Sequence, residues 1–144
     1  MVTALGVLAA AAVAQTRAAS GHDGEAGQPA VPAASDAGTV RGLVDVTIPD
    51  LDGPAAEGAP LFADTCAACH GAAGSGTEQG PPLIHVIYEP SHHGDLAFLH
   101  AVRQGVRAHH WRFGDMPPQL HVGDDEIAAI TAYVRAVQRA NGID

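Results

Sequence analysis

Five consecutive residues, Cys66-Ala67-Ala68-Cys69-His70, constrain this chain more than any other feature of its sequence. The two cysteines are three residues apart, so on one helical turn both thiols lie on the same face. Such a pair can reach the two vinyl groups on one edge of a porphyrin, and Cys-x-x-Cys-His is the motif for covalent attachment of a c-type haem. The motif therefore predicts one haem c (heme c), attached through Cys66 and Cys69, with the adjacent His70 as an iron ligand.

Two other kinds of site also use a Cys-x-x-Cys pair. One is the redox-active dithiol of thioredoxin-like proteins, which is typical of a βαβ context, and no alternating strand pattern surrounds Cys66 and Cys69. The other is half of a tetrahedral zinc site. The chain has only 2 cysteines, so histidines would have to supply the remaining zinc ligands. The sequence favours haem attachment over both alternatives.

A second, independent signal is Met116, which lies in the segment from Gly114 to Pro118. Two prolines follow Met116 directly, and they restrict the backbone so that the thioether can be held in a fixed position. Methionine more often fills a gap in a hydrophobic core, but Asp, Gly and Pro are poor neighbours for a core residue. We therefore predict that Met116 is the second axial ligand of the iron.

Composition limits the size of the domain and the class of its partners. The chain has 144 residues, of which 47% are hydrophobic but only 4% aromatic, so one modest domain is expected, with a thin core unless a bound group fills it. Its 7 basic residues are all arginines, against 16 acidic residues, and the formal net charge is −9. Nucleic acid requires a broad basic surface, so a generic DNA or RNA partner is excluded.

The N-terminal part of the chain differs in composition from the rest. Residues 1–14 contain an apolar run, Leu5–Ala14, that is too short to span a bilayer and ends in the small-x-small pattern of a signal-peptidase site. We interpret this segment as a signal peptide, or as an uncleaved leader that would bring the protein to the membrane. Residues 15–54 are rich in Gly, Ala, Pro and Asp and predict a flexible linker. Within it, Val40–Ile48 alternates in polarity and predicts an extended arm.

The remaining domain, residues 55–144, predicts three main helices joined by long loops. The first helix is expected to include Leu61 and Phe62 and to run into Cys66. The second is expected to have Asp95 as its N-terminal cap and to end at Gly105. The third is expected to start at Asp124 and to stop at Asn141-Gly142. Pro60 has no N–H to donate, so the first helix either begins at this proline or is kinked there. The loops at residues 71–89 and 109–123 are rich in Gly, Pro and His, and side-chain packing alone would hold them poorly. We expect them to wrap a large rigid ligand.

With these features the sequence resembles a class I cytochrome c, of the small bacterial kind with one haem. The resemblance extends from about Ala55 to Asn141. Beside the haem motif and the methionine segment, it rests on Gly58–Phe62, Gly80-Pro81-Pro82-Leu83 and Tyr133-Val134-Arg135. It implies an all-α cytochrome c fold, with three main helices and long loops wrapped around one covalently bound haem.

The resemblance also implies roles for individual residues. In this family the first and last helices cross closely, with a small residue near an aromatic one, and Gly58, Phe62 and Tyr133 match those positions. The carbonyl of a proline after the haem motif typically accepts the Nδ1 hydrogen of the proximal imidazole, and Pro81 fits that position best. Such a bond would fix the tautomer of the ligand and strengthen it.

The implied function is that of a periplasmic electron carrier whose haem iron cycles between Fe(II) and Fe(III). With both axial positions occupied, no coordination position is left for a substrate. No enzymatic activity is therefore expected. Its partners would be redox proteins. Two alternatives stay open: a haem with a displaceable sixth ligand, as in a peroxidase or gas sensor, and a copper-handling cytochrome that uses the pairs His92-His93 and His109-His110. Some of His109, His110, Trp111 and Arg112 could bond the haem propionates, and the histidines could also be solvated surface groups. One of them in place of Met116 would give a bis-histidine haem of lower reduction potential.

Overall fold

The structure, a computed structural model, describes residues 38–144. Its elements, with η for a 3₁₀-helix, are β1 (Gly38–Arg41), β2 (Asp45–Ile48), α1 (Gly53–Thr65), α2 (Ala67–His70), η1 (Ala72–Gly74), η2 (Val86–Tyr88), α3 (Asp95–Gln104) and α4 (Asp124–Ala140). The described part is therefore helical apart from one two-stranded hairpin, as the predicted fold class requires. The expected signal peptide, residues 1–14, and the first part of the expected linker lie outside the described residues.

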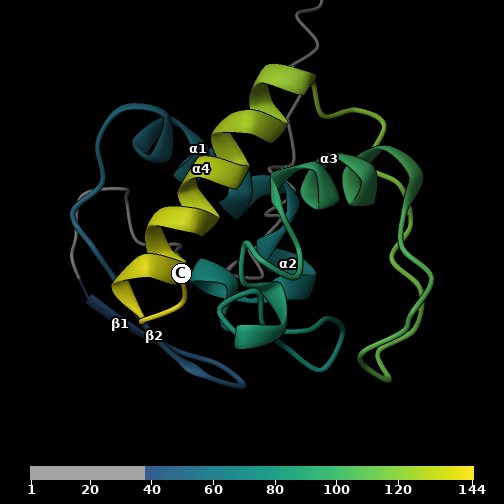
Figure 1. Ribbon diagram of the computed structural model, residues 1–144, viewed down its shortest axis with the longest axis horizontal. Helices are drawn as coiled ribbons and strands as arrows, with labels where there is room; N and C mark the ends of the chain where they lie inside the picture. The colour runs from purple at the N-terminus through teal and green to yellow at the C-terminus, as the bar shows by residue number, and fades with distance from the viewer. Residues whose placement is uncertain (1–37) are drawn as a thin grey trace, which may run out of the picture.

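Helices α1 and α4 cross in direct contact and organise the fold (Figure 1). The crossing is close because Gly58 has no side chain: a Cβ atom there would lie 2.0 Å from the carbonyl oxygen of Ala129. Beside it, the rings of Phe62 and Tyr133 pack with their centroids 5.3 Å apart at an interplanar angle of 50°. A small residue and an aromatic pair thus meet at this crossing, as expected.

Helix α1 begins earlier than the sequence indicated. It starts at Gly53, with Pro54 in its first turn, and Pro60 lies inside it, so the alternative in which the helix begins at Pro60 is wrong. Pro60 is exposed, and its ring does not have to fit into the core. The helix ends at Thr65, and the N–H of Cys66 donates to the carbonyl of Phe62 at 2.8 Å. The haem motif therefore starts where this helix ends.

Helices α3 and α4 begin and end close to their predicted positions. The residue before α3 is Gly94, so Asp95 stands in the first turn and not at the expected cap position. Helix α3 ends at Gly105, whose φ of 74° is in the left-handed region that favours glycine. Helix α4 follows Gly123, whose N–H donates to the carboxylate of Glu126 at 2.7 Å.

The expected extended arm, Val40–Ile48, is not one continuous strand, because it contains the end of β1, a bend at residues 42–44 and all of β2, which form an antiparallel hairpin. Strand β1 pairs with β2, with Gly38 opposite Ile48, and Val46 is fully buried. The hairpin is attached to the C-terminal end of α4 (Figure 1), where the amide of Asn141 donates to the carbonyl of Thr47 at 2.8 Å and accepts from its N–H at 2.9 Å. Residues 38–48 of the expected linker are therefore held against the domain by burial and by paired backbone groups.

The hydrophobic core joins the hairpin, α1, α3 and α4. Its buried apolar side chains include Val46, Phe62, Leu83, Ile84, Val102, Val122, Ile127, Ile130, Tyr133, Val134 and Val137. Between α2 and α3, and again between α3 and α4, most of the chain forms irregular loops. Across residues 38–144, no helix combines the length and the apolar character needed to cross a membrane.

Candidate functional site

The residues predicted to contact a haem line one cavity. This cavity has a volume of about 490 Å³, and Cys66, Cys69, His70, Pro81 and Met116 all contribute to its wall. Its other lining side chains are mostly apolar and come from α1, α3, α4 and the loops between them. A largely apolar cavity with a few convergent polar groups is the usual form of a cofactor site.

The two cysteines lie at a tight junction between α1 and α2. Cys66 ends α1, and its carbonyl accepts from the N–H of Cys69 at 3.2 Å and from the N–H of His70 at 2.9 Å. Both cysteines are free thiols in the structure, and Cys69 is the more exposed. One short helical turn thus brings both sulfur atoms and the imidazole to the same cavity wall.

The loop that follows the motif supports it from behind. The hydroxyl of Thr77 donates to the carbonyl of Cys69 at 2.6 Å, and the N–H of Gly76 donates to the carbonyl of His70 at 2.6 Å. Gly80 lies against the same place, since a Cβ there would be 2.9 Å from the carbonyl oxygen of Cys69. Sequence reasoning missed Thr77, because a single threonine in a Gly-rich loop carries no pattern that reveals a long-range bond.

His70 is oriented by Pro81. The Nδ1 atom of His70 donates to the carbonyl oxygen of Pro81 at 2.9 Å, because a carbonyl can only accept. This bond leaves Nε2 of the neutral ring with a free lone pair for a metal. The pKa of His70 is lowered, mainly because the ring is buried, while the bond to Pro81 acts in the opposite direction. The imidazole therefore favours the neutral form that a metal requires.

The raised pKa of the Cys66 thiol argues against a redox-active dithiol. Burial, and then the neighbouring Cys69, raise the pKa of the Cys66 thiol to about 11. Redox-active Cys-x-x-Cys pairs work with one thiol whose pKa is lowered, to about 7 in thioredoxin. Zinc is also disfavoured, because among residues 38–144 the one close grouping of three metal-ligating side chains contains neither cysteine.

Met116 is held by a short backbone bridge. Its N–H donates to the carbonyl of Val106 and its carbonyl accepts from the N–H of Val106, both at 2.9 Å. Gly105 allows this close approach, since a Cβ there would lie 2.5 Å from the carbonyl oxygen of Met116. The methionine segment is thus fixed to the end of α3, a pairing that the sequence did not reveal. The two prolines after Met116 indicated only that the segment is stiff.

An unpaired polar atom supports the fit of a haem in this cavity. The indole Nε1 of Trp111 is buried and, within the described part of the chain, makes no hydrogen bond of good geometry, although it acts on the nearby Tyr88 hydroxyl and opposes the larger effect of burial, which raises the pKa of Tyr88. Trp111 lines the same cavity. A buried donor without a partner is costly, and a haem brings two propionate groups that can accept a hydrogen bond. Together with the thiols, the imidazole and the apolar walls, this donor makes the residues present a suitable set for haem c.

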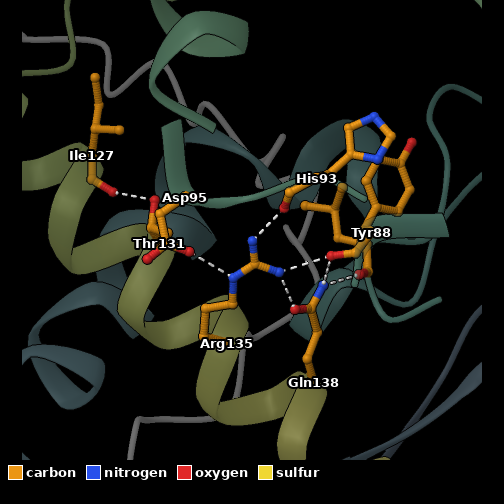
Figure 2. A network of polar contacts seen from close by, with 8 residues as sticks. Tyr88, His93, Asp95, Ile127, Thr131, Arg135 and Gln138 are labelled. Carbon is orange, nitrogen blue, oxygen red and sulfur yellow. Dashed lines mark hydrogen bonds and ion pairs between the residues drawn. The ribbon is translucent and has the colours of Figure 1, made fainter. Parts of the chain in front are cut away.

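A buried arginine holds one loop of the cavity in place (Figure 2). Arg135 on α4 donates to the carbonyl of Tyr88 at 2.7 Å, to the carbonyl of His93, and to the carboxylate of Asp95 at 2.8 Å. Gln138 donates to the carbonyl of Tyr88 at 3.1 Å and accepts from Arg135 at 2.6 Å. Arg135 is buried and connects α4 to the loop before α3.

Four histidines come together beside the cavity. They are His92, His93, His109 and His110, of which the last three also line it. The rings of His109 and His110 have centroids 4.3 Å apart, and those of His92 and His93 are 4.6 Å apart. The pKa of His110 is lowered by desolvation and then by the charges that His109, His93 and His92 carry when protonated. The sequence indicated the two pairs but not their contact.

A comparison with protein-family models gives one match, to Cytochrome c, over residues 55–138. No solved structure matches the chain. The family match covers more than half of the chain and contains the cavity residues described above, including Cys66, Cys69 and His70. It confirms the cytochrome c fold and implies a covalently bound c-type haem and a role in haem-based electron transfer with redox partner proteins. On these grounds, the chain belongs to the cytochrome c family.

Proposed function

We propose that this protein is a periplasmic electron carrier with a single haem c, in which His70 and Met116 are the two axial ligands. The observation that carries the proposal is that both side chains line one cavity although they come from distant segments. His70 follows the attachment cysteines directly, and Met116 lies in a loop fixed to the end of α3. Imidazole and thioether together are the ligand pair of electron-transferring cytochromes c.

Each residue has a separate task in this proposal. Cys66 and Cys69 hold the haem through thioether bonds, and Pro81 keeps the Nδ1 hydrogen of His70 in place so that Nε2 faces the iron. Met116 occupies the opposite axial position. With both positions taken, no site remains for a substrate on the metal, so we propose that the protein is not an enzyme.

When bound, haem c supplies the Fe(II)/Fe(III) couple that accepts and releases one electron. The chain sets the potential of this couple through its ligands and surroundings. A methionine ligand raises the reduction potential. Apolar side chains around the cavity, such as Phe98, Val102 and Val134, exclude water from the metal. The described residues therefore provide a rigid, dry environment, as an electron carrier requires.

Addition of carbon monoxide to the reduced protein tests this proposal against its main rival, a haem with a displaceable sixth ligand. We expect a reversible one-electron titration and no change in the visible spectrum when carbon monoxide is added, because Met116 keeps its position. The variant Met116→Ala is the positive control, since it opens the sixth position and should bind carbon monoxide. Rapid binding by the unmodified protein would instead support a peroxidase or a gas sensor.

The proposed periplasmic location rests on the N-terminal sequence alone. The apolar run Leu5–Ala14 and the small residues at Ala12 and Ala14 support export and cleavage before Gln15. Cell fractionation followed by N-terminal sequencing tests this part independently of the haem ligands. A mature protein in the periplasmic fraction that starts at Gln15 is expected. A cytoplasmic, uncleaved protein would contradict it.

A further inference from the structure

The histidine cluster beside the cavity has no task in the electron carrier proposed above. His92 and His93 lie in the loop before α3, and His110 lies in the loop after it. The Nε2 atoms of His92 and His110 are 3.3 Å apart. One ring nitrogen from each of His92, His93 and His110 lies within 4.8 Å of the other two. Three imidazoles from two loops therefore converge on one point at the edge of the haem cavity.

We propose that His92, His93 and His110 form a binding site for a divalent transition-metal ion, copper(II) or zinc(II). In a tetrahedral site with metal–nitrogen distances of about 2.0–2.1 Å, two ligand nitrogens are about 3.4 Å apart. The separation of 3.3 Å between the Nε2 atoms of His92 and His110 is close to this value, and a ring nitrogen of His93 lies within 4.8 Å of both ligand atoms. His92 and His110 are exposed and His93 is half-buried, so an ion can reach the site from solvent. Imidazole is a preferred ligand of both metals.

The hydrogen bonds around the cluster prepare the rings for a metal. The Nδ1 atom of His93 donates to the carbonyl of Ile87 at 2.7 Å, which leaves Nε2 as the nitrogen with a free lone pair. His109 has the same arrangement, with Nδ1 donating to the carbonyl of Arg107 at 2.8 Å, and is next to His110. Its ring nitrogens do not join the three that lie within 4.8 Å of one another, so the site has three ligands from the chain. Metal-binding histidines commonly have this bond from the second ring nitrogen to a carbonyl.

The backbone that carries two of the ligands is also fixed. The N–H groups of His92 and His93 donate to the carbonyl of Glu89 at 3.1 and 2.8 Å, which closes a turn. Arg135 donates to the carbonyl of His93 from the interior (Figure 2). A metal would therefore order few additional groups, which favours binding.

The proposed site is separate from Cys66, Cys69, His70 and Met116, so its test does not depend on the axial ligands. Isothermal titration calorimetry of the full-length, haem-loaded protein with zinc chloride, and then with copper(II) chloride, measures binding. Haem-loaded protein is needed because its cysteines are in thioether bonds and do not compete for metal. We expect one ion per chain, with copper(II) bound more tightly than zinc(II), following the general affinity order of these ions.

Two exposed ligands and one control residue make the test specific. The double variant His92→Ala/His110→Ala should lose affinity by about 100-fold or more, since two of three ligands are removed. The variant His121→Ala, which removes an exposed histidine outside the cluster and outside the cavity wall, should bind as the unmodified protein does. Absence of saturable binding, or equal binding by the double variant, would overturn the proposal. Such a result would leave these histidines as surface or propionate-binding groups.

A spectroscopic measurement identifies the ligands directly. The electron paramagnetic resonance spectrum of the copper(II)-loaded protein should show coupling to at least three nitrogens, and fewer in the double variant. Because His93 and His110 also line the haem cavity, a bound dication should raise the reduction potential of the haem by favouring the less positive ferrous state. Redox titration with and without saturating zinc tests this effect, with the double variant as control. An unchanged potential in zinc-saturated protein would contradict a site at the cavity edge.

Discussion

The Nδ1 atom of His70 and the carbonyl oxygen of Pro81 are 2.9 Å apart, and this bond joins the haem motif to the loop that follows it. The bond selects one tautomer and directs Nε2 of His70 away from the loop. The backbone bridge between Met116 and Val106 similarly fixes the opposite segment. The segments that carry both proposed axial ligands are thus fixed by hydrogen bonds to backbone groups.

Stability should decrease in mild acid because of His70. Its pKa is lowered in the folded protein, so the unfolded chain takes up the proton first as the pH falls. The neutral His70 ring therefore makes its full contribution to the free energy of unfolding above the unfolded pKa of about 6.5. This contribution is lost as the pH falls from there through the lowered pKa of the folded protein. Coordination of iron also requires the neutral imidazole, so protonation of His70 lowers stability through the loss of this bond as well. Urea unfolding of the haem-loaded protein at about pH 7.5 and about pH 5.5 measures this change.

The His110→Ala variant is the control for this prediction, because among residues 38–144 His110 is the other histidine whose pKa is lowered. His70 remains in this variant, so most of the decrease should persist. Equal or greater stability at the lower pH would show that His70 is not held in its neutral form.

Replacement of Gly58 should weaken the contact between α1 and α4. In Gly58→Ala the new methyl group would lie 2.0 Å from the carbonyl oxygen of Ala129, so the helices have to move apart. We expect a loss of about 3 kcal/mol in the free energy of unfolding. The adjacent variant Glu57→Ala, on the exposed face of α1, should change stability by less than about 0.5 kcal/mol. Similar losses in both variants would contradict a close helix crossing.

Arg135 should be essential for the loop before α3. Arg135→Met leaves the carbonyls of Tyr88 and His93 without this donor, and we expect a loss of about 2–4 kcal/mol. Hydrogen exchange should also become faster in the loop. Arg139→Ala, at an exposed position in the last turn of α4, should have almost no effect on either measurement. Slow exchange that persists in Arg135→Met would show that other contacts hold the loop.

The hairpin should depend on one side chain that directly follows α4. Asn141→Ala removes both bonds to the backbone of Thr47, and the amide protons of β2 should exchange faster, with a loss of about 1–2 kcal/mol. Thr47→Val is the matched control, because Asn141 contacts only the backbone of that exposed residue. If Thr47→Val accelerates the exchange of the β2 amide protons as much as Asn141→Ala does, the Thr47 side chain holds the hairpin, and not the hydrogen bonds from Asn141.

The reduction potential should respond to the identity of residue 116. Met116→His replaces a thioether by an imidazole, which donates more electron density and stabilises the ferric state. We expect the midpoint potential to fall by on the order of 100–300 mV, within the range that axial ligands cover. Redox titration measures the shift. A potential unaffected by this change would mean that Met116 does not bind the iron.

The fold could be predicted largely from local patterns. Helix α4 combines acidic residues at its start with an apolar stripe, and the end of α3 is set by Gly105, so both were located within a few residues. The start of α1 was missed because Pro60 indicated a boundary, whereas the helix continues through Pro60 although this residue has no N–H to donate. The pairing of β1 with β2 was also missed, since the segment before Val40 has no strand pattern.

The cavity residues were visible in the sequence because their chemistry depends on short spacings. The attachment motif is contiguous, and Met116 is followed by two prolines. The supporting contacts are of another kind. Thr77 and Arg135 donate hydrogen bonds to backbone carbonyls of loop residues or of residues distant in sequence. Val106 and Met116 likewise pair through their backbone groups. Backbone carbonyls are present at every residue, so no sequence pattern distinguishes those that accept a bond.

Near-infrared magnetic circular dichroism of the oxidised, haem-loaded protein tests the central claim most directly, because this spectrum depends on the pair of axial ligands of low-spin ferric haem. With His70 and Met116 as ligands, we predict the pattern of imidazole–thioether coordination, and its loss in Met116→Ala. A bis-imidazole pattern, or a high-spin spectrum in the unmodified protein, would contradict the account.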